Sequence, residues 1–492
     1  MDLILVPISI SFFICSLITY KLYQWRLRYN LPPGPYPLPF IGNLHTIEPD
    51  RADCFQKWST TYGPIISVWF GSTLNVIVSS SQLAKEVLKD KDDKLANRHR
   101  NKLTDMITQN GKDLSWADYT PSYVNLRKIC ALELFTSSRI EAIRSIREDE
   151  VKTMIQSIFT ASNKHHLVVR NYVGLATFNI ITRMVLGKKF SSKGMEFKEI
   201  AAEELKLGAI MNLLEYIPGL IWLRKKAFSD HKSRRDGLIQ AIIDEHKTGK
   251  SKHGFVDALL NEIDEETMRG LIWDLITAGI DTTAITVEWG MAEIMRNPRV
   301  QCKIQEELDS VIGLNRTMSE SDISKLSYLE CFVKEVLRLH PPTPLMLPHK
   351  ASEDVKVGGY DIPKGTIVCV NVRAIGTDPN NWEDPSEFRP ERFLEEDVDL
   401  KGSDFRVLPF GAGRRMCPAA QLSVNLVASM IGHLCHHFRW RPPFGVLPEE
   451  IDMSGTPALV NYIRTPLLGV PKVRLQAHLY NHISNSTSSF IY

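Results

Sequence analysis

The distribution of hydrophobic and polar positions divides the chain into an uncharged N-terminal run and a long body of mostly helical periodicity. Residues Leu3–Tyr20 include no charged side chain. At about 1.5 Å per residue this run is about 27 Å long, close to the thickness of a bilayer core. Lys21, Arg26 and Arg28 follow it. Because basic residues stay on the cytoplasmic side, the pattern predicts a single-pass transmembrane anchor over residues 1–20 and a cytosolic body.

A cleaved signal peptide is the alternative for the same run. No basic segment precedes it, and no cleavage site of small residues stands at its end, so a retained anchor is favoured. Five prolines lie between Leu31 and Phe40, and proline cannot continue a helix. We therefore expect residues 21–40 to form a basic stop and a stiff, extended, proline-rich hinge that sets the angle between anchor and body.

Strand-like runs beyond the hinge are few and short. Two of them, Ile65–Phe70 and Asn75–Val78, flank turn residues at Gly71–Ser72 and predict a hairpin. Lys356–Pro363 and Thr366–Asn371 predict a second pair of strands.

Most other segments have the 3.6-residue period of helices. The sequence thus predicts a mainly α fold with small β-sheets. No break in composition divides residues 41–475, which we expect to form one catalytic domain. Residues 476–492 are expected to be a disordered tail.

Composition excludes several functional classes. Lys plus Arg number 59 and Asp plus Glu 57, so the net charge of +2 gives no basic footprint for nucleic acid. Eight cysteines in 492 residues, without CxxC spacing, are too sparse for a disulfide scaffold and favour a reduced compartment. The chain has neither a GxGxxG dinucleotide fingerprint nor a P-loop, so we expect it to bind no nicotinamide or flavin of its own.

The first candidate site is the segment FGAGRRMC, which ends at Cys417. Gly411 and Gly413 allow the backbone to turn tightly beside a flat ligand, with amide groups pointing at a sulfur. Hydrogen bonds of this kind, and the start of the helical segment that follows, favour a thiolate. Phe410 can shield the sulfur, and Arg415 can pair with a carboxylate of the ligand. The alternative is a buried structural cysteine.

The second candidate is the pair Glu335 and Arg338, three residues apart and therefore on one helix face. Alone, such a pair is most simply a solvated surface pair. A later Pro-Glu-Arg-Phe segment supplies Arg392. Since buried charges persist when they are paired, these three side chains can lock a helix to a loop.

The third candidate is Ala-Gly-Ile-Asp-Thr-Thr, which begins at Ala278 within an apolar run. A small-residue site followed by an acid, Asp281, and an alcohol, Thr282, suggests a local groove with a proton relay. The alternative is a helix in which the threonine hydroxyls bond back to main-chain carbonyls.

A fourth cluster, His433, Cys435, His436 and His437, invites a zinc interpretation. Successive helix positions point in different directions, so these side chains are not expected to converge on one ion. We expect a solvated helix end instead.

The first three candidates form an ordered set of four motifs, AGIDTT, EVLR, PERF and FGAGRRMC, spread over about 140 residues. This set resembles the cytochrome P-450 superfamily of haem-thiolate monooxygenases. The resemblance implies the P-450 fold, a haem b cofactor and location in the endoplasmic reticulum membrane. It also implies electrons from NADPH through a separate NADPH–cytochrome reductase.

The resemblance also implies residue roles. Cys417 matches the axial ligand of haem iron, whose thiolate favours O–O cleavage. Asp281 and Thr282 match an acid–alcohol pair that delivers protons during oxygen activation. Glu335, Arg338 and Arg392 match a triad that supports the haem loop. Haem contacts are implied at Tyr123, Arg127, His349, Phe410, Gly411, Gly413 and Arg415.

The chain departs from the superfamily pattern at two positions. Tyr123 stands where tryptophan is common, although a phenol can still donate a hydrogen bond. Ala419 stands where the pattern has glycine. The extra methyl group is expected to shift packing or redox potential slightly without abolishing haem binding.

From about Leu31 to Pro471, segments such as GKDLSWADY, WDLITAGIDTTAITVEW, PPTPLMLPHKA and VGGYDIPKG look like the plant p-coumaroyl shikimate/quinate 3′-hydroxylase family. That family oxidises the 4-hydroxyphenyl ring of p-coumaroyl esters to caffeoyl products, and some relatives accept polyamine amides. The chain departs from it at ANRHR, at Met106–Asn110, around Cys417 and around residues 162–166, which leaves the acyl acceptor open. Residues expected to line the substrate pocket are Met106, Ile107, Leu114, Ala278, Thr343, Leu345 and Ala458.

Three rival functions stay open from the sequence. The first is a haem-thiolate isomerase or dehydratase that uses no dioxygen, against which the Asp281–Thr282 pair argues. The second is a non-catalytic, membrane-anchored haem binder. The third is a monooxygenase acting on another small phenolic compound, such as a flavonoid.

Overall fold

The computed structural model describes most of the body of the chain. The described residues are 28–163, 165–189, 196–197, 199–201, 203–204, 222–248, 254–260 and 262–480. The predicted anchor over residues 1–20 and the first part of the predicted hinge lie outside the described residues.

Helices make up most of the described chain, as the sequence predicts. They are α2 (Arg51–Tyr62), α3 (Ser81–Lys85), α4 (Asp92–Leu95), α5 (Lys102–Ile107), α6 (Pro121–Cys130), α7 (Ser137–Ala142), α8 (Arg144–Ala161), α9 (Val169–Leu186), α11 (Trp222–Lys247), α12 (Phe255–Leu259), α13 (Glu265–Arg296), α14 (Pro298–Val311), α15 (Ser327–Leu339), α16 (Val372–Gly376), α17 (Arg392–Glu395) and α18 (Ala420–His437).

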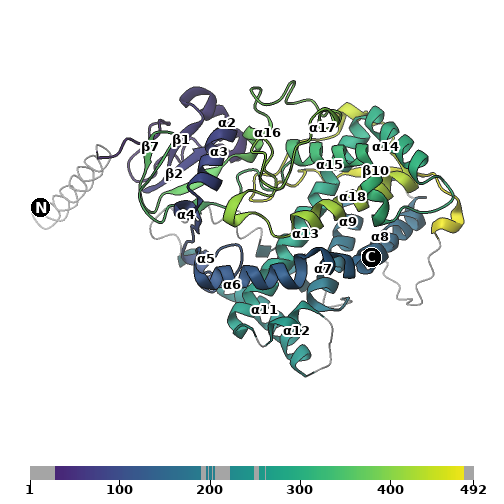
Figure 1. Cartoon of the computed structure of the whole chain (residues 1–492), viewed down its shortest axis with the longest axis horizontal. Helices are drawn as coiled ribbons and strands as arrows, with labels where there is room; N and C mark the ends of the chain where they lie inside the picture. The colour runs from purple at the N-terminus through teal and green to yellow at the C-terminus, as the bar shows by residue number, and fades with distance from the viewer. Residues whose placement is uncertain are drawn as a thin grey trace, which may run out of the picture.

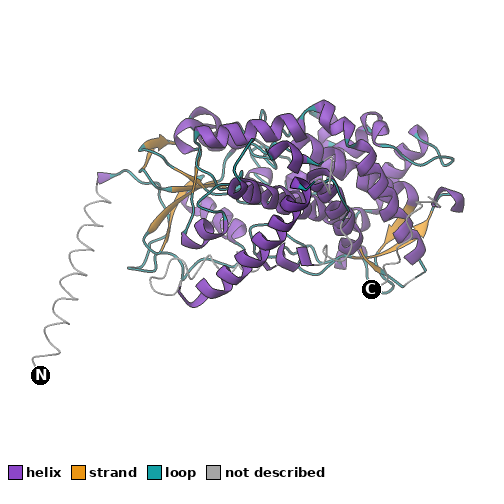
Figure 2. Ribbon diagram, turned by 90° about the horizontal axis from the view of Figure 1, so that it is seen from below, coloured by secondary structure: helices purple, strands orange, loops and turns teal. Residues whose placement is uncertain are grey.

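Strands are short and gather at the two ends of the helical body (Figures 1 and 2). One sheet has the order β1-β2-β8-β5-β3, a second has the order β4-β10-β9, and β6 pairs with β7 alone. The strands are β1 (Ile65–Phe70), β2 (Thr73–Val78), β3 (Asn97–Arg98), β4 (Leu167–Val168), β5 (His349–Lys350), β6 (Val355–Val357), β7 (Tyr360–Ile362), β8 (Ile367–Val370), β9 (Phe438–Arg441) and β10 (Leu468–Val473).

One predicted strand pairing is confirmed and the other is wrong. Strands β1 and β2 form the expected antiparallel hairpin, with Ile65 opposite Val78. The run Lys356–Pro363 is not one strand beside the next run: it folds on itself as the β6–β7 hairpin, while β8 pairs with β2 and β5. The reason is the turn at Gly358 and Gly359, which have φ of 58° and 82°, because glycine adopts positive φ without strain.

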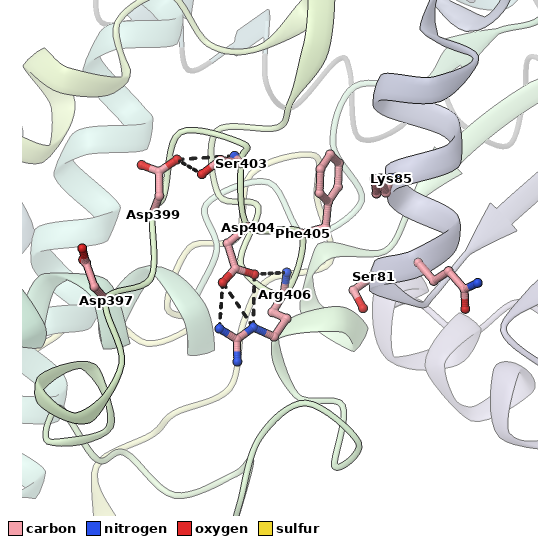
Figure 3. A pocket seen from close by; sticks show the side chains of 9 residues that line it. Ser81, Lys85, Asp397, Asp399, Ser403, Asp404, Phe405 and Arg406 are labelled. Atoms are coloured by element: carbon pink, nitrogen blue, oxygen red, sulfur yellow. Dashed lines mark hydrogen bonds and ion pairs between the residues drawn. The ribbon is translucent and has the colours of Figure 1, made fainter.

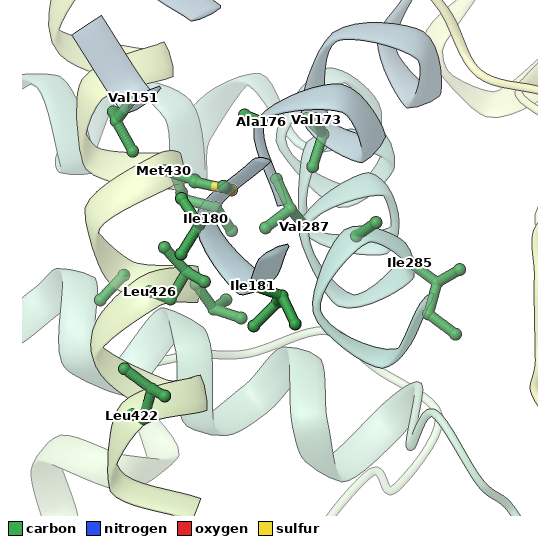
Figure 4. Packing of buried hydrophobic residues seen from close by; sticks show 14 of the residues in the cluster. Val151, Val173, Ala176, Ile180, Ile181, Ile285, Val287, Leu422, Leu426 and Met430 are labelled. Atoms are coloured by element: carbon green, nitrogen blue, oxygen red, sulfur yellow. The ribbon is translucent and has the colours of Figure 1, made fainter. Parts of the chain in front are cut away.

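The centre of the fold is the long helix α13, which packs against α9, α15 and α18. Figure 4 shows aliphatic side chains of α8, α9, α13 and α18 meeting in this core. By length and composition α13 passes the test for a membrane span, but the surrounding helices bury most of its apolar residues.

The small residues of α13 have a packing role at this crossing. A β-carbon on Gly279 would lie 3.0 Å from the side chain of Ile181 on α9. The absence of a side chain at this position therefore lets the two helices approach closely.

The described part of the proline-rich hinge is attached to the sheet. The amide of Ser67 in β1 donates to the carbonyl of Pro33 at 2.8 Å. Gly34 lies so close to β1 that an added β-carbon would stand 2.0 Å from the carbonyl oxygen of Ser67. The side chain of Asn43 donates to the Pro35 carbonyl at 3.1 Å and accepts from the Trp69 amide at 2.7 Å. These contacts hold residues 33–43 in a fixed orientation relative to the body.

The predicted tail begins later than residue 476. Ala477–Tyr480 forms a short 3-10 helix, and the side chain of Tyr480 is buried. Its hydroxyl donates to the carbonyl of His437 at 2.6 Å. This part of the tail packs on the end of α18, and residues 481–492 lie outside the described residues.

Candidate active site around Cys417

The segment Phe410–Cys417 is a tight loop that leads into α18. The amide of Cys417 donates to the carbonyl of Phe410 at 2.9 Å. Gly411 and Gly413 have φ of 68° and 65°, which glycine tolerates and other residues resist. The loop ends three residues before α18 begins at Ala420, so Cys417 lies just ahead of the helix N-terminus, as predicted.

Two further contacts fix the loop, one from the short helical segment Glu86–Asp90 and one from α4. A β-carbon on Gly413 would lie 2.0 Å from the carbonyl oxygen of Leu88. Next to it, the amide of Arg414 donates to the buried carboxyl group of Asp92 at 2.7 Å. Both contacts require the backbone itself to come close, which explains the glycine.

Cys417 is half-buried, and desolvation of its thiol raises the pKa of that thiol. The amide of Ala419 donates to the sulfur and the Arg127 guanidinium attracts a negative charge, and both oppose this rise. The net direction is upward in the absence of a metal ion, and the thiolate stays a prediction for the sulfur that binds a metal. A buried thiol with a raised pKa is a poor nucleophile, but a metal ion that binds the sulfur displaces its proton.

Cationic side chains surround the loop. Arg415 donates through Nε to the Ala96 carbonyl at 2.7 Å and through Nη2 to the Ala117 carbonyl. Its guanidinium carbon lies 3.9 Å from the centre of the Tyr123 ring. Among the described residues, the buried Nη1 of Arg415 has no hydrogen-bond partner.

Arg127 holds the other side of the loop. It donates to the Met416 carbonyl at 2.6 Å and to the Tyr123 hydroxyl at 3.3 Å. The Tyr123 hydroxyl in turn lies 3.5 Å from the carbonyl of Arg414. The departure from tryptophan thus leaves a polar group in contact with the loop.

Sequence reasoning missed Arg98. It is 6% exposed, and it donates to the carbonyls of Ser115 and Leu347 at 3.1 and 2.7 Å. Burial and the charge of Arg415 lower its pKa to about 9. The same causes, with Arg98 as the neighbouring cation, lower the pKa of buried His349 to about 3. Strand β3 pairs Arg98 with His349 of β5. This pairing joins segments far apart in the sequence, so the arginine within ANRHR was the only local sign of a buried cation here.

These residues fit a haem. Arg98 and Arg415 donate hydrogen bonds to main-chain carbonyls, and the Nη1 of Arg415 has no partner among the described residues. Cationic donors of this kind suit the carboxylates of a flat anionic ligand. Cys417 supplies one sulfur. Among the described residues no group of three or more histidine, cysteine or acidic side chains gathers to hold a bare ion.

The structure brings the predicted triad together inside the protein. Arg338 donates from Nε and Nη2 to the two carboxylate oxygens of Glu335 at 2.7 and 2.8 Å. Arg392 donates from Nε to the same carboxylate at 3.1 Å. The carboxylate also accepts from the amide of Arg389 at 2.8 Å. All three side chains of the triad are buried, so the solvated surface pair is excluded.

Asp281 and Thr282 are half-buried neighbours on α13. The hydroxyl of Thr282 donates to the carbonyl of Ala278 at 2.7 Å, which is the back-bonding arrangement that the sequence left as an alternative. Burial raises the pKa of Asp281, while a hydrogen bond from Tyr462 and the charge of Arg170 lower it. The acid therefore has partners that its own motif does not contain.

Met106, Ile107 and Leu114, which are predicted to line the pocket, lie on α5 and in the segment after it, and residues 102–115 are called the cap below. Arg235 of α11 donates to the carbonyl of Ile107 at 2.7 Å. The amides of Leu114 and Ser115 donate to Asp274 of α13 at 3.1 and 2.9 Å. Met106 is half-buried on α5. The cap is thus attached to α11 and α13 by hydrogen bonds.

The remaining pocket candidates are spread over three elements. Ala278 is on α13, and Leu345 packs against the sheet cluster of β1 and β2. Thr343 is half-buried in a loop, and Ala458 is exposed at the tip of another. Those two loops touch, because the amide of Asn461 donates to the carbonyl of Pro342 at 2.9 Å.

The predicted solvated end of α18 is wrong. His433, His436 and His437 are at most 2% exposed, and Cys435 is fully buried. The imidazole rings hydrogen-bond to carbonyls, such as that of Gly313, which lies 2.9 Å from His436 Nε2. Later elements cover this end of the helix, including Tyr480, which the helical period of α18 alone does not reveal.

A surface groove lies apart from these residues. It occupies about 490 Å³ between α3 and the loop that contains Asp404 and Arg406. Figure 3 shows that these two side chains pair with each other, at 2.8 Å, and that Ser403 hydrogen-bonds to Asp399. The groove contains none of the predicted site residues.

Comparisons with known proteins agree with this geometry. The family model described as Cytochrome P450 matches residues 32–466. Cytochrome P450 98A2 of Glycine max is 56% identical, over 98% of this chain and 99% of the relative. Flavonoid 3′-monooxygenase of Petunia hybrida is 36% identical, over 98% and 99%.

A solved structure supports the fold independently. A zebra fish cytochrome P450 determined with abiraterone has a TM-score of 0.75 and 26% identity, covering 87% of this chain and all of that one. With a family model over most of the chain and a relative 56% identical along nearly its whole length, this chain belongs to the cytochrome P450 family and is a haem-thiolate monooxygenase.

Proposed function

We propose that this chain is a membrane-bound monooxygenase of the endoplasmic reticulum that hydroxylates the 3′ position of p-coumaroyl conjugates. The substrates are p-coumaroyl esters of shikimate or quinate, or p-coumaroyl amides of the spermidine type, and the products are caffeoyl conjugates. Residues 1–20 form the anchor, 21–40 the hinge and 41–475 the catalytic domain facing the cytosol. Dioxygen is the oxidant, and NADPH supplies electrons through a separate reductase.

One observation carries the proposal. The half-buried Cys417, with Arg98, Arg127 and Arg415 near its loop, occurs in a chain that is 56% identical to Cytochrome P450 98A2. The segments that resemble the p-coumaroyl ester hydroxylases include residues 111–119 and much of α13. The name of the Petunia relative, Flavonoid 3′-monooxygenase, makes flavonoids the second candidate substrate class.

The residues around the cofactor have distinct roles in this proposal. When bound, haem supplies the activation of dioxygen. Cys417 is its sulfur ligand, and the Ala419 amide hydrogen-bonds to that sulfur. Arg415 and Arg98 would hold the propionates, and the Nη1 of Arg415, which has no hydrogen-bond partner among the described residues, is a donor available for this. Burial of His349 keeps its imidazole neutral in this cluster, so it contributes a hydrogen bond rather than a third charge.

The substrate side of the site uses α13 and the cap. Asp281 and Thr282 hold exchangeable protons at neighbouring positions of one helix. Leu114 is held in place by the hydrogen bonds of its segment to Asp274.

The test is turnover by the full-length chain in microsomes that also contain a plant reductase. p-Coumaroyl shikimate, p-coumaroyl quinate, a p-coumaroyl spermidine and a flavonoid are supplied side by side with NADPH. Products are identified by the mass of one added oxygen and by comparison with caffeoyl standards. Turnover of the esters or of the amide supports the proposal and identifies the acyl acceptor, whereas turnover of the flavonoid alone refutes it.

Two variants make the result specific. Cys417→Ala is expected to lose both the carbon-monoxide difference spectrum and all product. Cys302→Ala is the matched control, since Cys302 is a free, half-buried cysteine on α14. Product that forms without NADPH or dioxygen would favour an isomerase, and a normal spectrum with no product from any compound would favour a non-catalytic binder.

A further inference from the structure

A loop beside the glycine loop carries one of the predicted pocket residues. This loop comprises residues 341–347 and contains Thr343. A β-carbon added to Gly411 in the glycine loop would lie 3.9 Å from the side chain of Met346. The carbonyl of the last residue of the 341–347 loop accepts from Arg98 at 2.7 Å. The position of this loop therefore determines part of the surroundings of the candidate active site.

The 341–347 loop is joined to a hairpin that carries another predicted pocket residue. The hairpin comprises residues 455–463, and a bridge joins its first residue to its last. Ala458 lies at its exposed tip. The amide of Asn461 donates to the carbonyl of Pro342 at 2.9 Å. Because of this bond, a displacement of Asn461 shifts the hairpin and the loop relative to each other.

One buried side chain of α13 holds this junction. The indole Nε1 of Trp289 donates to the carbonyl of Asn461 at 2.8 Å, and Trp289 is 1% exposed. The side chain of Asn461 is confined as well, since a β-carbon on Gly455 would lie 2.0 Å from its Oδ1. Asn461 therefore binds the 341–347 loop through its amide and α13 through its carbonyl.

Trp289 also contacts the residue that precedes the 341–347 loop. The ring of His340 stacks on the indole, with the ring centres 4.2 Å apart and the planes at 5°. The Nε2 of His340 lies 2.7 Å from a carboxylate oxygen of Glu293. Glu293 follows Trp289 by four residues, so the two side chains share one face of α13. This face therefore holds the loop at its start through His340 and farther along through Asn461.

We propose that Trp289, supported by Glu293 through His340, is a positioning residue for substrate binding. Its indole fixes the separation between the 341–347 loop and the hairpin, and thus the shape of the pocket that both segments border. Asp281 and Thr282 lie about two turns earlier on the same helix. One rigid element therefore carries both the predicted proton relay and the support for the substrate-binding loops. The proposal rests on the proposed function, which supplies the substrate.

The arrangement predicts weaker substrate binding with unchanged chemistry when the indole hydrogen bond is lost. Trp289→Phe keeps a flat ring against His340 but removes the Nε1 donor. In the full-length holoenzyme with reductase, the KM for the preferred p-coumaroyl conjugate is expected to rise about five-fold, the worth of one net hydrogen bond. The dissociation constant from substrate-induced spectral titration should rise by the same factor. The kcat should change less than about two-fold, because Trp289 contacts neither the glycine loop nor Asp281 in this arrangement.

Trp440→Phe is the matched control. Its indole is also buried, at 2% exposure, and Nε1 donates to the carbonyl of Leu434 at 2.9 Å. Trp440 lies on β9, which pairs with β10 rather than with the 341–347 loop or the hairpin. The control therefore loses an equivalent buried hydrogen bond elsewhere in the fold, and its KM should equal that of the wild type. The carbon-monoxide difference spectrum should be unchanged in both variants.

Amide hydrogen exchange provides a measurement that is independent of activity. In Trp289→Phe, the amides of residues 341–347 and 455–463 should exchange faster together, whereas Trp440→Phe should leave both segments as in the wild type. An unchanged KM, a fall in kcat without a rise in KM, or an equal rise in KM in Trp440→Phe would each overturn the proposal. Unchanged exchange of either segment in Trp289→Phe would also overturn it.

A second variant decides the outcome if Trp289→Phe does not retain haem. His340→Phe preserves the stacked ring and removes the bond to Glu293, so the start of the 341–347 loop should exchange faster and the KM should rise. An unchanged KM in this variant would overturn the proposal.

Failure of the proposed function is a separate result. A wild-type enzyme that forms no product from any p-coumaroyl conjugate would refute the substrate assignment. The exchange measurement requires no substrate, so it would still support or overturn the role of Trp289 in holding the two segments.

Discussion

Replacing Glu335 with glutamine is expected to destabilise the protein severely, because one carboxylate neutralises two buried arginines. Arg338 and Arg392 donate to it over distances of 2.7 to 3.1 Å, and none of the three side chains is more than 5% exposed. A neutral amide removes the counter-charge and presents one acceptor oxygen in place of two. Breaking a buried pair of this kind costs about 3–5 kcal/mol, a large part of the about 5–15 kcal/mol that stabilises a typical native protein.

The same helix provides a matched control. Glu330 pairs with Lys334 at 3.2 Å, but its side chain is 55% exposed. An exposed pair is worth less than about 1 kcal/mol, since water and salt screen it. Glu330→Gln therefore changes the charge by the same amount in α15 with little expected loss of stability.

The assay is urea unfolding of the purified holoenzymes followed by tryptophan fluorescence, with the carbon-monoxide difference spectrum as a measure of correctly bound haem. Glu335→Gln should lower the free energy of unfolding by about 3–5 kcal/mol and reduce the yield of haem-loaded protein. Equal stability of Glu335→Gln and Glu330→Gln would refute the reasoning, because burial and shared charge would then contribute nothing.

Three other variants test the loop, the buried histidines and the cap. Gly413→Ala should lose haem-loaded protein, since its β-carbon would meet a carbonyl oxygen at 2.0 Å, whereas Gly359→Ala, at a positive φ in open space, should cost about 1–2 kcal/mol. Burial lowers the pKa of His433. Below an unfolded-state pKa of about 6.5 the unfolded chain therefore gains a proton more readily than the folded protein. The stability should decrease as the pH decreases, by up to about 1.4 kcal/mol per pH unit. His433→Gln should flatten that dependence in urea titrations at pH 7.5 and 5.5, and the exposed His478→Gln should not. Asp274→Asn should raise the KM for the substrate about five-fold with little change in the haem spectrum, because one of its charge-assisted hydrogen bonds to the cap is lost; an unchanged KM would contradict a role for this contact.

Local patterns predicted the part of the site that is contiguous in the chain. The glycine loop before Cys417 and the start of α18 depend on neighbouring residues, so spacing was sufficient to predict their geometry. The Glu335–Arg338 pair follows in the same way from helical spacing. Arg392 joins that pair from a distant loop, and the expectation that buried charges are paired was enough to include it.

Features that depend on tertiary contacts were missed. Arg98 joins the cationic cluster because β3 pairs with β5, and no pattern within ANRHR specifies that register. The histidines of α18 were assigned to solvent because polar side chains at a helix end usually meet water, but Tyr480 covers this end. Desolvation raises the pKa of the Cys417 thiol in the absence of a metal ion, an effect that the pattern of the glycine loop does not reveal.

The position of Arg170 shows why the catalytic helix alone does not define this site. This residue of α9 donates to the buried carboxylate of Glu288 on α13 at 2.7 Å and to the carbonyl of Ile463 at 2.7 Å. One cation therefore joins α13 to a hairpin near the C-terminus whose tip, at Ala458, is exposed. The haem loop, in contrast, is fixed by rigid contacts to Leu88 and Asp92. Variation among relatives that changes the substrate can therefore alter the tip of this hairpin while leaving the cysteine loop untouched.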